Sequence, residues 1–410
     1  MKKLLLVLLI LSLFINHLNA NEKDLNIIQK DKKEYRLLEK ESIQTRQQSQ
    51  KYDWISPIDL SGNIGRNHSF SDENSRNLNN KNTKSASIGF TQSIFESGGI
   101  GFKMDYADNR FKYEMLSWEN QNSQLIYTIY NTLLDIKKLK LEINQNEYRI
   151  VNKDIELIIK KIQYEAGKTD IIELNNAIMS KNLIQKEEIA LKNSLKEKEQ
   201  ELAKYTDLKY DEIEILDFQE TNKDIFLDKN YSILEADSKV EMLNSEYKIK
   251  KSQYLPKLSL SAKASYSNQD EKFNSMINDT NKDDATSSGS LILTMPLYDY
   301  TKSSKIQESK IEVLKQKALV NDLKNETAFE YEQIFTKIDT YLKQNETINK
   351  NIKLYQELIG ANQISSEAGM TSKYDLEILE NTKTINEFDI LINKINILQQ
   401  YAKLYFKIKN

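Results

Sequence analysis

The chain has 410 residues and a formal net charge of −3, with 58 basic and 61 acidic residues. This near balance is not the profile of a nucleic-acid-binding protein. There is no Cys, and there are only two His. These counts argue against zinc sites built from Cys and His and against catalysis by Cys–His or Ser–His pairs. The composition therefore argues against an enzyme, and no metal or cofactor is expected.

Residues 1–20 have the parts of a secretory signal. Lys2 and Lys3 form a basic start, residues 4–15 form an apolar core, and the segment ends at Ala20. The core is too short for a membrane anchor, because a membrane-spanning helix needs about 20 apolar residues. We therefore expect an exported protein whose mature form keeps His68 as its only histidine.

Most of the remaining chain is predicted to be helical. Long stretches rich in Lys, Glu, Leu, Ile and Gln contain neither Gly nor Pro, and this composition favours helix. The three prolines, Pro57, Pro256 and Pro296, fall in two short regions that also hold several of the ten glycines. Because Gly and Pro mark turns and element ends, the helical stretches are expected to be interrupted twice.

Both interruptions contain sequences in which apolar and polar residues alternate. This period of two is typical of strands with one apolar and one polar face. The predicted strands are 58–64, 85–94, 257–267 and 288–295, and the polar loops 71–84 and 268–288 join the members of each pair. Their lengths are near the 9–11 residues of a transmembrane strand. Two soluble hairpins packed on the helices would show the same alternation.

The helical stretches carry apolar residues at a spacing of seven. The repeating positions are Leu134, Leu141, Tyr148, Ile155 and Ile162 in the first stretch, and Ile338, Ile352 and Ile359, interrupted by Asn345, in the second. This spacing is typical of a coiled-coil seam, although an ordinary helical bundle can share it. It does not fit a compact α/β enzyme.

The two halves of the chain repeat each other. Phe95 lies 72 residues before Gly167, and Leu297 lies 72 residues before Gly369. A helix of that length spans about 100 Å. Each glycine is preceded by Glu-Ala and followed by a shorter helical stretch. A glycine between two helices suits the tight turn of a helical hairpin.

Four strands cannot close a barrel, because about eight are needed, and an open sheet edge in lipid leaves backbone groups without partners. If the strands lie in a membrane, several copies must assemble, and three copies would supply twelve strands. The expected fold is mainly α, with long helical hairpins forming an α-helical barrel. If three copies assemble as a homotrimer, each chain would add four strands to a shared transmembrane β-barrel, with lipid outside and water inside.

At this point the sequence resembles the TolC-like outer-membrane efflux proteins over about 25–409. The matching segments are YLPKLSLSAKASYS (254–267), SLILTMPLYDYTKSSKIQESK (290–310), YEAGKTDIIELNNA (164–177) and SEAGMTSKYDLEILE (366–380). The resemblance implies an outer-membrane channel of a tripartite efflux or type I secretion system in a Gram-negative envelope. Such a channel extends into the periplasm and meets a periplasmic adaptor and an inner-membrane pump.

We divide the chain accordingly. The expected parts are a signal peptide (1–20), an N-terminal helical segment (21–51), a first strand pair (52–97), a first helical hairpin (98–206), a linker and helix (207–253), a second strand pair (254–298) and a second helical hairpin (299–410).

The resemblance also implies two sets of functional residues. Adaptor docking would use the hairpin tips, namely Ala166, Gly167, Lys168, Ala368, Gly369 and Met370. Carboxylates would ring the pore aperture: Asp375, with Glu377 and Glu173. A ring of carboxylates creates a negative potential that favours cations. Both sets of residues also have a purely structural interpretation. The glycines can serve only as hairpin turns, and the acids can serve only to stabilise helix N-termini through the helix dipole.

Two other functions stay open. A periplasmic structural or adaptor protein with coiled-coil arms and no pore would share the helical pattern. A hydrolase that uses only carboxylates is formally possible. Adaptors usually carry a compact lipoyl-like or barrel domain rich in Gly and Val, and none is visible in the sequence. An enzyme should offer a compact pocket, which two long helical arms do not.

Overall fold

A computed structural model describes residues 24–70, 78–216, 218, 220–270, 282–367 and 372–409. The expected signal peptide and the predicted tip residues Ala368, Gly369 and Met370 lie outside them. The chain forms two compact units. The helical unit consists of Met1–Lys40, Leu116–Leu234 and Asn321–Asn410, and the sheet unit consists of Glu41–Met115 and Glu235–Val320.

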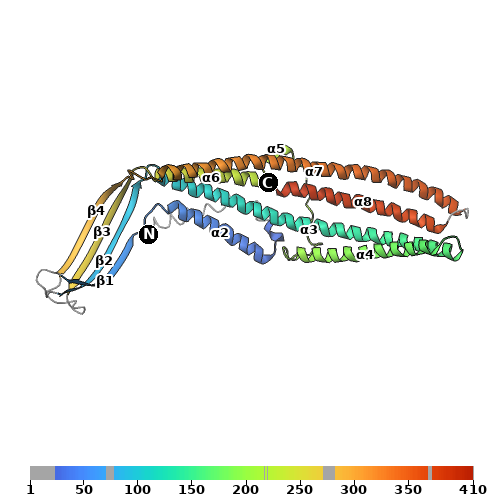
Figure 1. Cartoon of the computed structure of the whole chain (residues 1–410), viewed down its shortest axis with the longest axis horizontal. Helices are drawn as coiled ribbons and strands as arrows, with labels where there is room; N and C mark the ends of the chain where they lie inside the picture. Colours follow the sequence, from blue (N-terminus) through green and yellow to red (C-terminus); the bar gives the residue numbers. More distant parts are fainter. Residues whose placement is uncertain are drawn as a thin grey trace, which may run out of the picture. The chain divides into compact units, whose positions relative to one another are not determined.

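The described chain is mainly helical, as predicted (Figure 1). A short 3-10 helix, η1 (Asp24–Ile27), precedes seven α-helices: α2 (Lys30–Tyr52), α3 (Gly99–Glu165), α4 (Ile171–Leu202), α5 (Lys223–Asp228), α6 (Tyr231–Ser252), α7 (Lys302–Glu367) and α8 (Lys373–Phe406). Helices α3 and α7 have 67 and 66 residues, so each is about 100 Å long. Among the described helices, none has the length and apolar character needed to span a bilayer.

Four strands form one antiparallel sheet in the order β1-β2-β3-β4. They are β1 (Asp59–Phe70), β2 (Leu78–Phe95), β3 (Lys257–Asp270) and β4 (Lys282–Thr294). The predicted loops 71–84 and 268–288 were too long, since β2 begins at Leu78 and β4 at Lys282. Alternation disappears in these segments because both faces are polar there, yet the backbone ladder continues, for example from Arg66 to Asn82.

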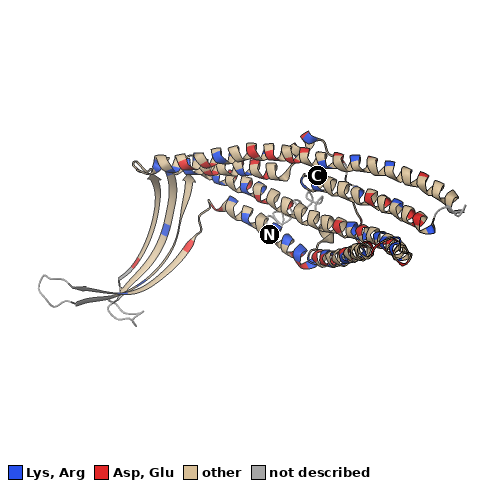
Figure 2. Ribbon diagram, turned by 45° about the vertical axis from the view of Figure 1, so that its right-hand side comes forward, with Lys and Arg blue, Asp and Glu red and all other residues tan. Residues whose placement is uncertain are grey.

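The sheet has one apolar and one polar face. In the middle of the sheet, Leu60, Ile88 and Ala264 share a row on the apolar face. Hydroxyls line the other face. The hydroxyl oxygens of Ser61 and Ser87 are hydrogen-bonded at 2.8 Å, and those of Ser265 and Thr286 are hydrogen-bonded at 2.8 Å. Few charged residues occur on the strands, whereas both signs of charge are spread along the helices (Figure 2).

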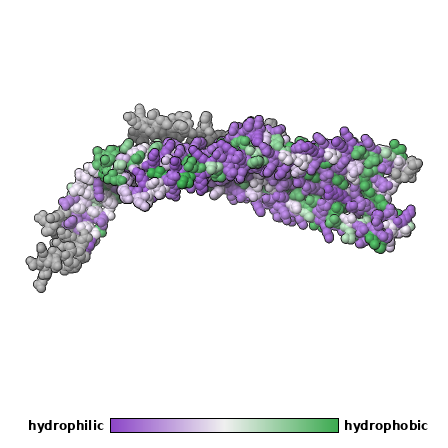
Figure 3. Space-filling view, turned by 45° about the horizontal axis from the view of Figure 1, so that its top comes forward, coloured by the Kyte–Doolittle hydropathy of each residue, from purple (hydrophilic) through white to green (hydrophobic). Residues whose placement is uncertain are grey.

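The apolar face is exposed to an unusual degree. Leu60 is 78% exposed, Leu291 66% and Leu293 70%. Further apolar residues gather where the strands meet the long helices (Figure 3), and Leu297 there is 90% exposed. Burying such side chains is favourable by roughly 1.5–3 kcal/mol each, so this face calls for an apolar environment outside the chain.

One glycine of the sheet is required by a close approach. A Cβ added to Gly89 would lie 3.0 Å from the carbonyl oxygen of Ala262 and 3.3 Å from the Cα of Lys263. Both neighbours belong to the backbone of β3, so they cannot move aside without disturbing the β2–β3 ladder.

Replacing Gly89 by alanine is therefore expected to destabilise the protein by about 1–3 kcal/mol through overpacking. Gly289→Ala is the matched control, because its Cβ would meet nothing within 4 Å. Thermal unfolding in detergent should show a lower melting temperature for Gly89→Ala alone. Equal melting temperatures for the two variants would contradict the close packing of β2 on β3.

In the helical unit, polar contacts give the helix order α4-α3-α8-α7. Between α4 and α3, Lys181 pairs with Asp154 at 2.6 Å. Between α3 and α8, the Gln145 amide donates to Asp389 at 2.7 Å. Between α8 and α7, the Asn393 amide donates to Asn345 Oδ1 at 2.9 Å. Asn345, which interrupts the predicted heptad pattern, thus pairs the last two helices in a defined register.

The apolar core of this unit lies at the end away from the hairpin tips. It consists of Phe226, Ile334, Ile338, Leu404 and Ile408, with Tyr331, Phe335, Ile397 and Tyr401 packed against it. Along α3, the heptad positions are not equally buried, and Tyr148 is 37% exposed. Leu134 is fully buried and Ile155 is 4% exposed, whereas Ile162, at the next heptad position, is 54% exposed. The heptad seam is therefore only partly covered within one chain.

Glu330 of α7 ties the end of α8 to this core. Its carboxylate pairs with Lys403 at 2.8 Å and with Lys407 at 2.5 Å. Burial alone would raise the pKa of Glu330, but the hydrogen bonds and charges of Lys403 and Lys407 outweigh it and hold the pKa below its ordinary value of 4.5. Because the folded-state pKa is lowered, the ionised carboxylate stabilises the fold.

This contribution is present above pH 4.5 and is lost as the pH falls through the lowered pKa. Glu330→Gln should cost about 2 kcal/mol at pH 7, because two charged hydrogen bonds are weakened, and less in acid. Glu332→Gln, which removes the more exposed pair with Lys223, should change stability by less than about 1 kcal/mol. The melting temperatures of wild type and Glu330→Gln, measured between pH 7 and pH 3, test this prediction. A difference in melting temperature that stays constant over this pH range would contradict the role of the Glu330 carboxylate.

Candidate functional site

The first hairpin tip is a compact turn between α3 and α4. Gly167 has φ +66, a conformation that residues with a Cβ rarely adopt. The N–H of Gly167 donates to the Tyr164 carbonyl at 2.9 Å, and the N–H of Lys168 donates to the Gln163 carbonyl at 2.8 Å. This pair of bonds is the Schellman arrangement, which ends α3 and exposes Ala166, Gly167 and Lys168 at the turn.

The first turn of α4 fixes Glu173. The Asp170 side chain accepts a hydrogen bond from the Glu173 N–H at 2.9 Å and so caps the helix. The Glu173 carboxylate pairs with Lys160 of α3 at 2.5 Å. The ion pair crosses the hairpin just behind the tip, so the negative charge of Glu173 is largely balanced within its own chain.

The first turn of α8 has the same construction. The Ser372 hydroxyl accepts a hydrogen bond from the Tyr374 N–H at 3.1 Å. Asp375 stands three residues after the cap, as Glu173 does in α4, and Glu377 follows it. Both side chains are exposed, and neither forms an ion pair with a residue that the structure describes. Asp375 therefore differs from Glu173 in its electrostatic surroundings.

The two hairpins lie together at the tip end of the helical unit (Figure 1). The Asn381 amide of α8 donates to Asn152 of α3 at 2.9 Å, and the Asn152 amide donates to the Thr382 hydroxyl at 3.3 Å. These contacts place the starts of α4 and α8 at the same end, with the predicted aperture acids Glu173 and Asp375 in their first turns. Of the two predicted tips, only the first falls within the described residues.

The capping residues Asp170 and Ser372 and the partner Lys160 were not predicted. A signal for the caps is present in the sequence, because Asp170 and Ser372 each precede an acid by three residues, as in a capping box. The Lys160–Glu173 pair could not be found this way, because its partners meet only when the hairpin folds. Among the described residues, His, Asp and Glu side chains form no group suited to a metal ion.

Part of the chain matches a known protein family. Residues 224–403 match the model of the outer membrane efflux protein family. No curated protein has a significantly similar sequence.

Solved structures share the fold over nearly the whole chain. The outer membrane protein VceC from Vibrio cholerae is 12% identical with a TM-score of 0.72, over 93% of this chain and 94% of VceC. The CmeC outer membrane channel of Campylobacter jejuni is 13% identical with a TM-score of 0.70, over 92% of this chain and 84% of CmeC. The open state of the MtrE outer membrane channel of Neisseria gonorrhoeae is 11% identical with a TM-score of 0.66, over 91% of this chain and 85% of MtrE.

At these identities the solved structures show the fold that the chain shares with outer-membrane channels. The family model adds a sequence similarity to the outer membrane efflux proteins over residues 224–403.

Proposed function

We propose that this chain is a subunit of an outer-membrane channel that serves as the passive export duct of a tripartite efflux or type I secretion system. The observation that carries the proposal is the four-stranded sheet. It has an exposed apolar face, a hydroxyl-lined opposite face, and outer edges on β1 and β4 that pair with no described strand of the same chain. The strands would lie in the outer membrane and the helices would extend into the periplasm.

Closing the sheet requires further copies. In lipid each unpaired backbone group costs several kcal/mol, so the edges of β1 and β4 cannot stay open. An antiparallel sheet of four strands begins and ends with oppositely directed strands, so β4 of one copy can pair with β1 of the next in the same antiparallel pattern. Three copies would give twelve strands, which is above the minimum of about eight.

The helical unit supports the same assembly. Its outer helices, α4 and α7, expose large apolar side chains. Leu183 of α4 is 66% exposed and Phe329 of α7 is 65% exposed. Contact between α4 of one copy and α7 of the next would cover both, and repetition around a threefold axis would form the helical barrel.

The tips and first turns provide the remaining roles. Ala166, Gly167 and Lys168, with the corresponding residues of the second tip, are proposed to dock a periplasmic adaptor that leads to an inner-membrane pump. Asp375, with Glu377 and Glu173, is proposed to line the aperture. The channel would have no enzymatic activity and would bind no nucleic acid. A periplasmic structural protein without a pore is disfavoured, because it leaves the apolar face of the sheet uncovered in water.

The direct test is the protein mass in detergent, measured by light scattering, followed by conductance in planar bilayers. The proposal expects a mass of three mature chains and discrete conductance steps. A protein that remains a monomer in detergent and conducts no ions would contradict it, because four strands cannot close alone.

The two first-turn acids should differ in their effect on ion selectivity. Asp375→Asn removes a charge that has no described partner, so three copies lose a ring of negative potential and the cation preference should fall about twofold or more. Glu173→Gln removes a charge that Lys160 already balances, so its effect should be smaller.

The measurement is the reversal potential across a salt gradient. Glu380→Gln, which changes an exposed acid of the same helix that has no proposed role, serves as the control. Unchanged selectivity in Asp375→Asn, with normal conductance, would remove Asp375 from the aperture.

A further inference from the structure

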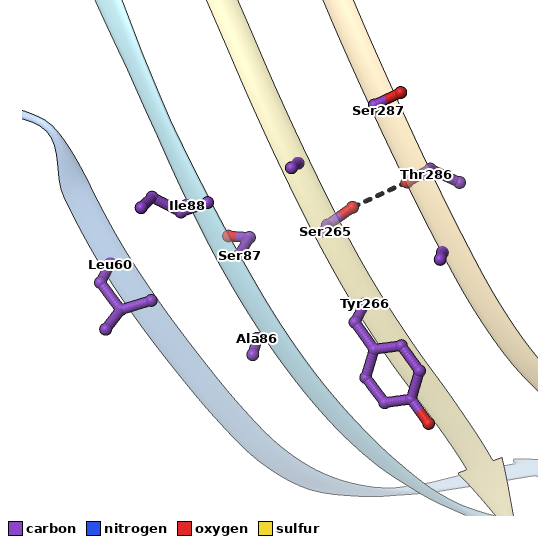
Figure 4. A pocket seen from close by; sticks show the side chains of 10 residues that line it. Leu60, Ala86, Ser87, Ile88, Ser265, Tyr266, Thr286 and Ser287 are labelled. Atoms are coloured by element: carbon purple, nitrogen blue, oxygen red, sulfur yellow. Dashed lines mark hydrogen bonds between the residues drawn. The ribbon is translucent and has the colours of Figure 1, made fainter.

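The apolar face of the sheet has a hollow of about 460 Å³. Its lining includes small residues on adjacent strands, Ala86, Ala264 and Ala285. The larger side chains of Leu60, Ile88 and Tyr266 also line it (Figure 4). The alanines and the large residues share two neighbouring rows of the sheet, so the hollow crosses the strands rather than following one of them. Its open, mainly apolar lining can lie against part of a chain-like apolar ligand.

Two basic residues stand on the same face just beyond the hollow. In the β1–β2 ladder, Ile64 pairs with Lys84 and Arg66 pairs with Asn82. Arg66 and Lys84 are thus diagonal neighbours, with Cα atoms about 7–8 Å apart. In the β2–β3 ladder, Ala86 pairs with Tyr266, so Tyr266 is a diagonal neighbour of Lys84 on the other side. The apolar hollow therefore ends at two cations and a phenol.

An apolar hollow followed by a tyrosine and two basic residues is complementary to a lipid, which has an apolar acyl chain and a charged headgroup. From the proposed function, the apolar face meets the acyl chains of the membrane, and its polar limit meets the headgroups. Tyr at that limit is typical, because its ring is apolar and its hydroxyl is polar. Arg and Lys extend toward anionic headgroups, and the guanidinium can bind phosphate with two hydrogen bonds.

We propose that each copy binds a phosphate-bearing membrane lipid at this place, with an acyl chain in the hollow between Leu60 and Tyr266 and the headgroup phosphate on Arg66 and Lys84. The proposal rests on the proposed function, since it places the apolar face in the bilayer. Arg66 lies on β1 and Lys84 on β2, so the phosphate is assigned to the β1–β2 side of the face.

The test is native mass spectrometry of the full-length channel in detergent, with phosphatidylglycerol or phosphatidylcholine added at equal concentration. Wild type should retain phosphatidylglycerol preferentially, with up to one lipid per copy. The double variant Arg66→Gln, Lys84→Gln should retain it about tenfold less or worse, because each basic residue near a membrane surface contributes to anionic lipid binding. Inorganic phosphate added alone should not displace the lipid, because it lacks the acyl chain.

Two further variants separate the site from general effects. Lys263→Gln removes an exposed charge from the opposite face and should leave lipid retention unchanged. Ala264→Phe fills the hollow without changing charge and should lower the retention of both lipids. Both positions are exposed, so neither change should prevent folding.

The outcomes are distinct. Equal retention of phosphatidylglycerol by wild type and the Arg66, Lys84 double variant, in samples that conduct ions, overturns the lipid site and leaves the channel intact. An equal loss in Lys263→Gln also overturns it, because the effect would then come from net charge. A wild-type protein that forms no channel contradicts the proposed function itself.

Discussion

The structure depends on one constraint, which is that the backbone groups of a β-sheet must find partners. The sheet of this chain stops after four strands, and the outer edges of β1 and β4 have no described partner in the same chain. In a membrane such edges are prohibitive, and in water the exposed apolar face would promote association. The proposed assembly would resolve both difficulties, since further copies would close the edges and the bilayer would cover the apolar face.

The helical unit also leaves surfaces without partners, but here they are apolar side chains and not backbone groups. A single layer of helices in the order α4-α3-α8-α7 can bury only the sides that face a neighbour within the layer. Side chains near the core end are fully buried, whereas Ile162 near the tip and Phe329 on the outer helix α7 stay exposed. In the proposed assembly, neighbouring copies around an axis would cover the sides that stay exposed. The polar pairs at Asn345 and Gln145 then fix which helices meet and in which register.

Much of this fold follows from local sequence. Strict alternation in 257–267 predicts β3, and the wide spacing of Gly and Pro predicts the two long helices. The first part of β2, which begins at Leu78, is not predicted as a strand. Its sequence before Ser85 is almost entirely polar, so apolar and polar residues do not alternate there. Glycine is needed at Gly89 because the backbone of β3 lies against it. That segment is about 170 residues away in the chain, so the sequence around Gly89 does not predict this requirement.

In the candidate site, too, local features can be predicted from the sequence and features that depend on the folded chain cannot. The turn at Gly167 and the caps of α4 and α8 are local and have sequence signals. The different surroundings of Glu173 and Asp375 are not local, because Lys160 reaches Glu173 only across the folded hairpin. Two acids at equivalent positions of a repeat therefore differ in available charge, so they would contribute differently to the proposed aperture.

The central claim is that β1 of one copy pairs with β4 of another. The chain has no cysteine, so cysteines introduced on the polar face of both edges, at Ser61 and Ser290, can form disulfides only with each other. After oxidation in membranes, a denaturing gel should show a ladder that ends at three linked chains, while each single-cysteine variant stays largely monomeric. If scanning neighbouring positions on both edges yields no linked chains, the shared barrel is contradicted.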